Sequence, residues 1–366
     1  MSVPAVIPNP QPRDRSTPIV GVSPFPTARP HPALGHAWPA LACVAALTLA
    51  YTLDAIVVSV APPIGPLAAW PWLIALVVFG MPHGAADWVV HRADRRHRGR
   101  SRGLLSFTGY LVWMAAAAAS LYLAPLLTVA GFFVLTAFHF GMADATHALG
   151  SSHTLSKSDR SAWWTLGVCR GALVLAIPFA MDPAGAWLPF AVLTQIGVTE
   201  LGLPVTTLQA LAGVAAAVLL LALIGALVRL RPGVWRQSRH WFVLESVAAV
   251  ALLALTPPLF AVGAYFLCIH APKHTLRLSM LDRWISPGRY AAFPGAAKLP
   301  ARLLHVHRES LALWPLSIAI ILAWALLLPD GLTATTVAAA SIGFYIVTTL
   351  PHHLLGTRLP GVPGNA

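Results

Sequence analysis

The sequence predicts an all-α protein whose helices form a polytopic bundle of about ten membrane spans. Only 10% of its 366 residues are charged and 57% are hydrophobic. A soluble globular domain carries about 25% charged residues, so this composition indicates an integral membrane protein. Apolar runs of about 20 residues, enough to cross the hydrocarbon core of a bilayer, recur along the chain. The loops between these runs alternate between basic and neutral or acidic, as they do in multi-pass proteins.

A proline-rich segment, residues 1–36, precedes the first apolar run and is expected to be disordered. It lacks the apolar region of a secretory signal. The first span ends at Ala61-Pro62-Pro63, and the second is followed by the densest basic loop, 92–102. The first five spans are expected at 37–60, 69–91, 104–123, 128–149 and 163–181.

Proline and glycine also delimit the second half of the bundle. The seventh span ends at Thr256-Pro257-Pro258 and the ninth at Pro329-Asp330-Gly331. The segments 182–204 and 283–308 are expected to be loops, the second of them basic and amphipathic. The last five spans are expected at 205–228, 241–255, 258–280, 311–328 and 333–355. Residues 37–358 would thus form one membrane domain, followed by a short tail, 359–366.

The distribution of arginine and lysine predicts how the bundle is oriented. The loops after even-numbered spans are basic, which places both termini in the cytoplasm under the positive-inside rule. The net charge of +12 therefore reflects orientation in a bacterial or archaeal cell membrane. It does not indicate nucleic-acid binding.

A histidine pair in the eighth span is the strongest functional signal. His270-Ala271-Pro272-Lys273-His274 places two imidazoles four residues apart, on one face of a helix. Ionisable residues inside a membrane are costly and therefore indicate function. Two imidazoles at this spacing suit a single metal ion.

Three further histidines lie at a similar depth: His83, His139 and His352, on the second, fourth and tenth spans. All these spans are even-numbered, and each histidine lies in the cytoplasmic half of its span. An imidazole site of this kind suits iron, copper, zinc or nickel. The sequence therefore predicts a metal site that several helices share.

Carboxylates accompany these histidines. Asp87 follows His83 by four residues and Asp144 lies near His139, and both are expected to accept an N–H from a ligating imidazole. Gly84 and Gly141 are expected to allow close helix approach. Glu245, in the seventh span, is expected to make a structural hydrogen bond, with a supporting role at the metal or a place on the substrate path as the alternatives.

At these residues the chain resembles the Brp/Blh family of membrane β-carotene 15,15′-dioxygenases, which are associated with microbial rhodopsins. The resemblance is carried by four stretches and covers nearly the whole chain after residue 80. One departure is Trp88, where the family often has histidine after the aspartate of the first stretch. The stretches are Pro82-His83-Gly84-Ala85-Ala86-Asp87, Phe138-His139-Phe140-Gly141 with Asp144, His270-Ala271-Pro272-Lys273-His274, and Pro351-His352 with Leu354-Leu355.

The resemblance implies a non-haem Fe(II) bound by His83, His139, His270 and His274, with His352 as an additional ligand or a supporting group. The substrates would be β-carotene, which partitions into the lipid bilayer, and O2. Cleavage at the central double bond would give two molecules of all-trans-retinal, a functional link to a microbial rhodopsin. No catalytic side chain beyond the metal ligands is expected.

Two other classes of function are weighed against this interpretation. A membrane di-iron desaturase or hydroxylase shares the HxxxH pattern but needs about eight histidines in cytosolic boxes, and this chain has too few at the right depth. The second class is a non-enzymatic metal or proton carrier, or a haem-binding or rhodopsin-associated protein. Transporters often show a sequence repeat in matching halves, and no such repeat is evident here. Haem would need only two axial histidines and would leave the others unexplained. No nucleotide-binding pattern occurs between a strand and a helix, so no nucleotide cofactor is expected.

Overall fold

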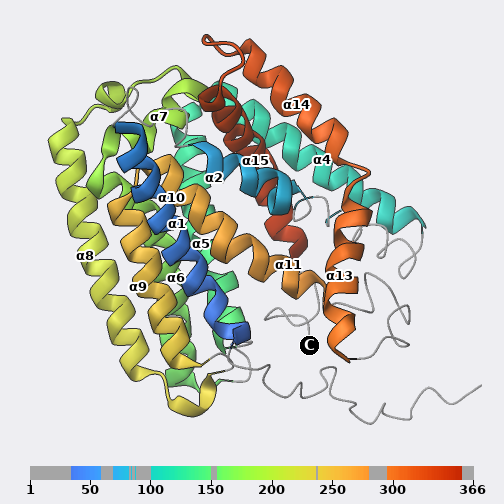
Figure 1. Ribbon diagram of the computed structural model, residues 1–366. Helices are drawn as coiled ribbons and strands as arrows, with labels where there is room; N and C mark the ends of the chain where they lie inside the picture. Colours follow the sequence, from blue (N-terminus) through green and yellow to red (C-terminus); the bar gives the residue numbers. More distant parts are fainter. Residues whose placement is uncertain are drawn as a thin grey trace, which may run out of the picture.

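Helices make up all the regular secondary structure that the computed structural model describes, which confirms the predicted all-α class (Figure 1). The described residues are 34–58, 69–81, 84, 87, 100–149, 155–235, 238–279 and 295–356. Residues 1–36, which are expected to be disordered, lie almost wholly outside the described residues. The longer helices are α1 (Leu34–Val58), α4 (Arg100–Leu123), α5 (Pro125–Leu149), α6 (Lys157–Met181), α7 (Pro183–Thr194), α8 (Val205–Arg229), α9 (Arg239–Leu255), α13 (Gly295–Ser310), α14 (Trp314–Leu327) and α15 (Ala334–Gly356).

Each of the ten expected spans contains a helix, but the number that cross a membrane stays a prediction. Among the described residues, four helices are long and apolar enough to span a bilayer, and a fifth span is possible if a pair bent by 60° is counted as one. That pair joins Leu303–Ser310 of α13 to α14. The four helices are α5, α6, α8 and α15, the last counted over Ala334–Leu354.

The expectation that 182–204 is a loop is wrong, because it contains α7. Asp182 caps this helix by accepting a hydrogen bond of 2.9 Å from the backbone N–H of Gly185, and Pro183 occupies the first helical position. Aspartate followed by proline is a typical helix start. Gln195 ends α7 in the left-handed conformation, with φ of 59°.

The second expected loop, 283–308, is also partly wrong. Residues 295–310 form α13, and the side chain of His307 contacts a neighbouring element instead of facing solvent. Its Nε2 lies 3.1 Å from the carbonyl oxygen of Val78. The amphipathic pattern in this segment therefore belongs to a helix that packs on the bundle.

Two expected spans contain a π-helical turn. The second is α2 (Trp70–Ala75) continued by η2 (Leu76–Gly80), and the eighth is α10 (Pro258–Tyr265) continued by η6 (Phe266–His270) and α11 (Ala271–Ser279). Single π-turns inside α-helices occur frequently at functional sites. Here η6 ends at His270, the first histidine of the pair His270 and His274.

Glycines bring α5 and α6 into backbone contact. A Cβ atom at Gly141 would clash with the carbonyl oxygen of Gly167, and one at Gly171 would clash with that of Ala137. Small residues spaced four apart allow such close packing between membrane helices. The expectation for Gly141 is confirmed. That for Gly84 is not supported, because a Cβ there would meet no described atom within 4 Å.

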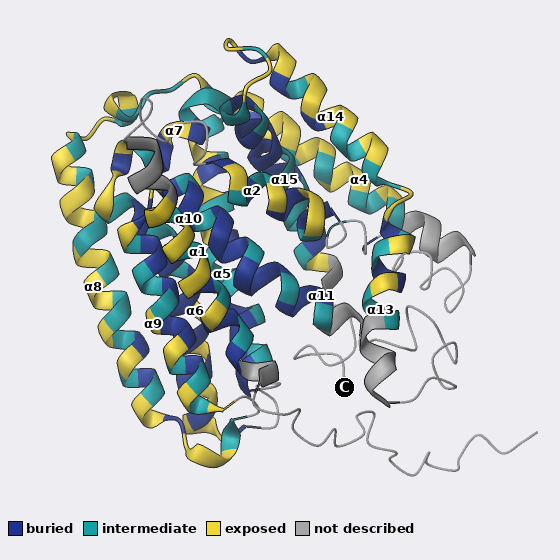
Figure 2. Cartoon of the chain, in the orientation of Figure 1, coloured by how far each residue is buried: buried dark blue, intermediate teal, exposed yellow. Residues whose placement is uncertain are grey.

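Exposed positions gather on the outer faces of the helices, and buried positions face the centre of the bundle (Figure 2). The outer face of α8 exposes Leu211, Val214, Val218 and Leu221. By contrast, His270, Lys273 and His274 on η6 and α11 are buried. Exposed leucine and valine with buried charge is the arrangement expected of a bundle in lipid.

Candidate metal centre

Imidazole rings from three parts of the chain gather around His139 of α5. The centroid of the His139 ring lies 5.1 Å from that of His270 and 5.9 Å from that of His274. On α15, His352 lies 5.3 Å away and His353 5.7 Å away. The structure therefore brings together three of the four predicted ligands, and His352 with them.

Both histidines of α15 contact this cluster, although the sequence favoured only one. The ring of His352 lies 5.6 Å from that of His274, and Nδ1 of His353 lies 3.4 Å from Nδ1 of His139. The fourth predicted ligand, His83, lies outside the described residues.

The ring spacings are compatible with imidazoles around one metal ion. With metal–nitrogen distances of about 2.1 Å, tetrahedrally placed imidazoles would have centroids roughly 5 Å apart. The spacings to His139 are of that size or up to about 1 Å longer. In the described part of the chain, no three histidine, cysteine or acidic side chains already have ligand geometry. The donor set therefore fits by chemistry and proximity, while assembly would require small ring movements.

Asp87 makes the carboxylate contact expected of it, but with another histidine. Its carboxylate accepts a hydrogen bond from Nδ1 of His352, at 2.8 Å from Oδ1, and one from the Tyr110 hydroxyl at 2.8 Å. Because a carboxylate only accepts, the proton of His352 resides on Nδ1. That tautomer leaves the lone pair on Nε2, as a metal ligand requires.

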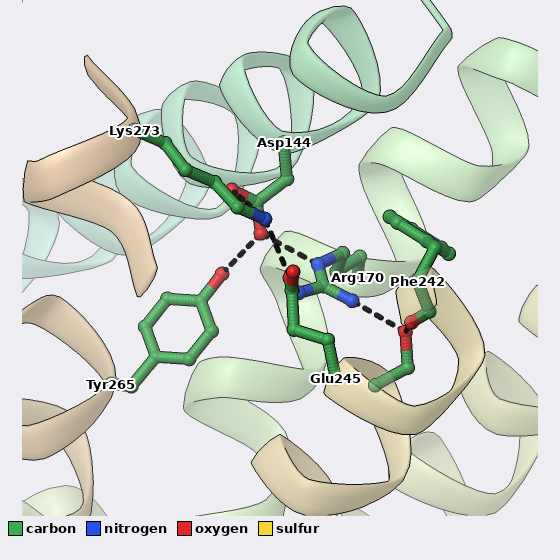
Figure 3. A network of polar contacts seen from close by, with 7 residues as sticks. Asp144, Arg170, Phe242, Glu245, Tyr265 and Lys273 are labelled. Carbon is green, nitrogen blue, oxygen red and sulfur yellow. Dashed lines mark hydrogen bonds and ion pairs between the residues drawn. The ribbon is translucent and has the colours of Figure 1, made fainter. Parts of the chain in front are cut away.

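A buried network of charged and polar side chains links α5, α6, α9, α10 and α11 (Figure 3). Arg170 of α6 donates through Nε to Asp144 of α5 at 2.6 Å, and it also bonds Glu245 of α9. Lys273 of α11 donates to Glu245 at 2.5 Å. The Tyr265 hydroxyl donates to Asp144 at 2.8 Å. Two carboxylates thus balance two cations in a region excluded from solvent.

This network revises the interpretation of the intramembrane acids. Glu245 makes the structural interaction expected of it. The bonds of Asp144 run to Arg170 and Tyr265, so this residue anchors α5, on which His139 lies. Arg170 and Lys273 are the important residues that sequence reasoning missed. Their signal was available, since a cation in a span needs a buried acid as partner.

A cavity of about 530 Å³ extends from the histidines through the bundle. Its walls include His139, His270 and His352, together with Phe140, Phe266 and Tyr345. The Phe140 ring lies 4.1 Å from that of His270, measured between centroids. The volume is in the range of small-molecule sites, and the lining is mostly aromatic and aliphatic.

The cavity reaches the apolar outer surface between α4 and α14. Leu111 of α4 lines it and is 47% exposed. On α14, Leu316 and Ile320 line it and are 63% and 44% exposed. An apolar ligand dissolved in the bilayer could therefore reach the histidines without crossing water.

The sequence model of the family described as "BCD: Beta-carotene 15,15'-dioxygenase" matches residues 74–359. The chain belongs to the β-carotene 15,15′-dioxygenase family. All the histidines of the cluster, Asp87 and the charge network lie within the matched residues.

Two curated members of this family in Halobacterium salinarum are similar to the chain. "Probable beta-carotene 15,15'-dioxygenase Blh" is 27% identical over 357 residues, which cover 95% of this chain and 97% of that protein. "Probable beta-carotene 15,15'-dioxygenase Brp" is 27% identical over 218 residues, 58% of each chain. No solved structure matches the present chain.

Proposed function

We propose that the protein is a membrane non-haem iron dioxygenase that cleaves β-carotene at its central 15,15′ double bond. The observation that carries the proposal is the histidine cluster in the wall of an apolar cavity, in a chain of this family. In the overall reaction, O2 breaks one carbon–carbon double bond. Each carbon receives one oxygen atom, which gives two molecules of all-trans-retinal.

Fe(II) would be held by His139, His270 and His274 with His83, and His352 would serve as an additional ligand or as a supporting group. When bound, iron supplies the electron transfer that lets O2 react with an alkene. Neutral imidazoles are suitable ligands for Fe(II). The protein fixes their orientation: Asp87 holds the ring of His352, and Lys273 ties the His270–His274 helix to α9.

The cavity would bind the polyene and exclude water. The rings of Phe140 and Phe266, with centroids 6.1 Å apart, flank His270 on the cavity wall. Aromatic faces of this kind suit a flat conjugated chain. Because β-carotene resides in the bilayer, access between α4 and α14 agrees with its solubility.

The proposal is tested in bacteria that produce β-carotene. Cells that express the protein should lose colour and accumulate all-trans-retinal, measured by chromatography of the extracts. His139→Ala should abolish retinal formation with the protein still in the membrane. The matched control is His240→Ala, because His240 is an exposed histidine of α9 outside the cluster. It should leave the yield of retinal unchanged.

The alternative classes give different results in the same experiment. Unchanged carotene with iron present in the purified protein would indicate another lipid substrate, such as that of a desaturase or hydroxylase. Unchanged carotene without bound metal would support a non-enzymatic role. Either result would contradict the proposed function.

A further inference from the structure

Two hydroxyl groups in the cavity wall have unused hydrogen-bonding capacity. Thr136 of α5 and Tyr345 of α15 both line the cavity that contains the histidines. Their oxygens are buried, and within the described residues neither has a hydrogen-bond partner. Thr136 is only 6% exposed. Because a buried hydroxyl without a partner is costly, such groups in a binding cavity point to a ligand.

Thr136 differs in this respect from the other helical threonines nearby. Thr348 also lines the cavity, but its hydroxyl donates to the carbonyl oxygen of Phe344 at 2.9 Å. Thr349 donates to that of Tyr345 at 2.6 Å, and Thr128, on the same helix as Thr136, to that of Ala124 at 3.0 Å. This bond to the preceding turn is the usual one for threonine in a helix. The hydroxyl of Thr136 does not make it.

The position of the Tyr345 hydroxyl depends on a glycine. A Cβ atom at Gly80 would clash with the hydroxyl oxygen of Tyr345. The ring of Tyr345 packs against Trp72 and Phe266, with centroids 5.7 and 5.8 Å away. The indole N–H of Trp72 donates instead to the hydroxyl of Ser341, at 2.6 Å. Gly80 thus leaves room for a hydroxyl that contacts no polar group in the described residues.

The two hydroxyls lie at different distances from the histidines along their helices. Thr136 precedes His139 by three residues, a rise of about 4.5 Å on the same helix. The Phe266 ring links Tyr345 to the cluster, since its centroid lies 5.7 Å from that of His270. Tyr345 precedes His352 by seven residues, about 10.5 Å along α15, so of the two residues only Thr136 lies within one helical turn of a histidine of the cluster.

We propose that Thr136 and Tyr345 each donate a hydrogen bond to an oxygen atom of an otherwise apolar polyene. The inference rests on the proposed function, in which a hydrocarbon substrate becomes two aldehydes. The oxygen would be the carbonyl of the product or a ring hydroxyl of an oxygenated carotenoid. Both accept a hydrogen bond, and β-carotene itself does not. The two hydroxyls thus bind an oxygen atom of the ligand and add no hydrogen bond to its hydrocarbon part.

The test compares Thr136→Val and Tyr345→Phe with Thr348→Val, using the purified full-length protein. Thr348→Val removes a cavity hydroxyl that is already bonded to backbone, so it controls for the loss of a hydroxyl as such. Binding of all-trans-retinal is followed by quenching of tryptophan fluorescence, and β-carotene binding is measured without O2. A carotenoid with ring hydroxyls is the third ligand, and thermal unfolding checks that each variant folds.

Loss of one hydrogen bond should weaken retinal binding about three- to tenfold in Thr136→Val and Tyr345→Phe. Affinity for β-carotene should not change, and Thr348→Val should match the wild type. If the two variants lost affinity only for the hydroxylated carotenoid, the two hydroxyls would still bind an oxygen atom. That atom would then be the ring hydroxyl of a substrate and not the carbonyl of the product. Equal affinities of all three variants for both oxygenated ligands would overturn the proposal.

A second variant acts without removing either hydroxyl. Gly80→Ala should displace the Tyr345 hydroxyl and weaken retinal binding as Tyr345→Phe does. If cells make no retinal but these binding differences persist, the proposed cleavage fails and the oxygen-binding site stands. If cells make retinal and the binding differences are absent, the proposed cleavage stands and the oxygen-binding site fails.

Discussion

His352 shows how a single carboxylate can determine which nitrogen of a histidine is available. Asp87 accepts a hydrogen bond from Nδ1–H of His352, so the lone pair resides on Nε2. Tyr110 donates to the other oxygen of the same carboxylate. A ring held from behind in this way loses little freedom when it binds a metal, and such partners commonly affect metal affinity.

Asp87→Asn should therefore weaken iron binding by roughly 10- to 100-fold, because an amide holds the imidazole less strongly and can favour the wrong tautomer. Iron affinity is measured by competition with a chelator. Asp159→Asn is the control, since Asp159 pairs with the exposed Arg231 away from the cavity. Equal iron affinities of the two variants would show that Asp87 has no role at the metal.

The sequence could predict the type of contact that Asp87 makes but not its partner. A spacing of four residues pointed to His83, whereas the bond to His352 joins residues 265 positions apart. Helical periodicity relates only residues on the same helix. Which helices become neighbours depends on packing, and that information was absent from the spacing.

Among the helices, α11 is held in place by charge. Lys273 lies between the two histidines of the pair and bonds Glu245 of α9, which Arg170 also contacts. Removing one cation leaves a carboxylate buried without full compensation. Such losses cost about 3–5 kcal/mol.

Lys273→Met should accordingly destabilise the protein by about 3 kcal/mol and lower iron occupancy. The double variant Lys273→Met/Glu245→Gln removes one charge of each sign and should recover part of that stability. Thermal unfolding in detergent measures both. A double variant less stable than Lys273→Met alone would contradict charge balance as the cause.

The contact between α5 and α6 depends on the absence of side chains. Gly141→Ala should force the two backbones apart and destabilise the fold by about 1–3 kcal/mol, as overpacking does. Gly213→Ala, in α8, is the matched control, since a Cβ there meets no described atom within 4 Å. It should be neutral or slightly stabilising. Equal melting temperatures would show that α5 and α6 are not tightly coupled.

The helices themselves were largely predictable, because apolar runs of the right length leave few other structures in lipid. The π-turns of η2 and η6 were not, since they arise from packing and have no composition of their own. The missed helix α7 had a readable start in Asp182-Pro183.

For the molecule as a whole, the route to the cavity is the feature with the most direct consequence. The exposed residues at the rim of the cavity lie on α4 and α14. Between these helices the cavity connects the histidine cluster to the apolar outer surface of the bundle. Because these rim residues are apolar and exposed, the opening would face the hydrocarbon core of the membrane. A substrate that never leaves the bilayer requires such an opening.

Leu316→Trp should narrow this opening and lower kcat/KM for β-carotene several-fold, with iron content unchanged. Leu326→Trp is the control, because Leu326 is 61% exposed on the same helix but does not line the cavity. Initial rates of retinal formation in detergent and in vesicles provide the readout. If both variants were equally active, the substrate would use another route.

The central claim is tested most directly by measuring iron content and product stoichiometry together on the purified protein. We predict about one iron per chain and two molecules of all-trans-retinal for each β-carotene consumed in the presence of O2. His274→Ala should lose both the iron and the product. Retinal formed at the wild-type rate without iron, or one retinal accompanied by a longer aldehyde, would contradict central cleavage at a histidine-bound iron.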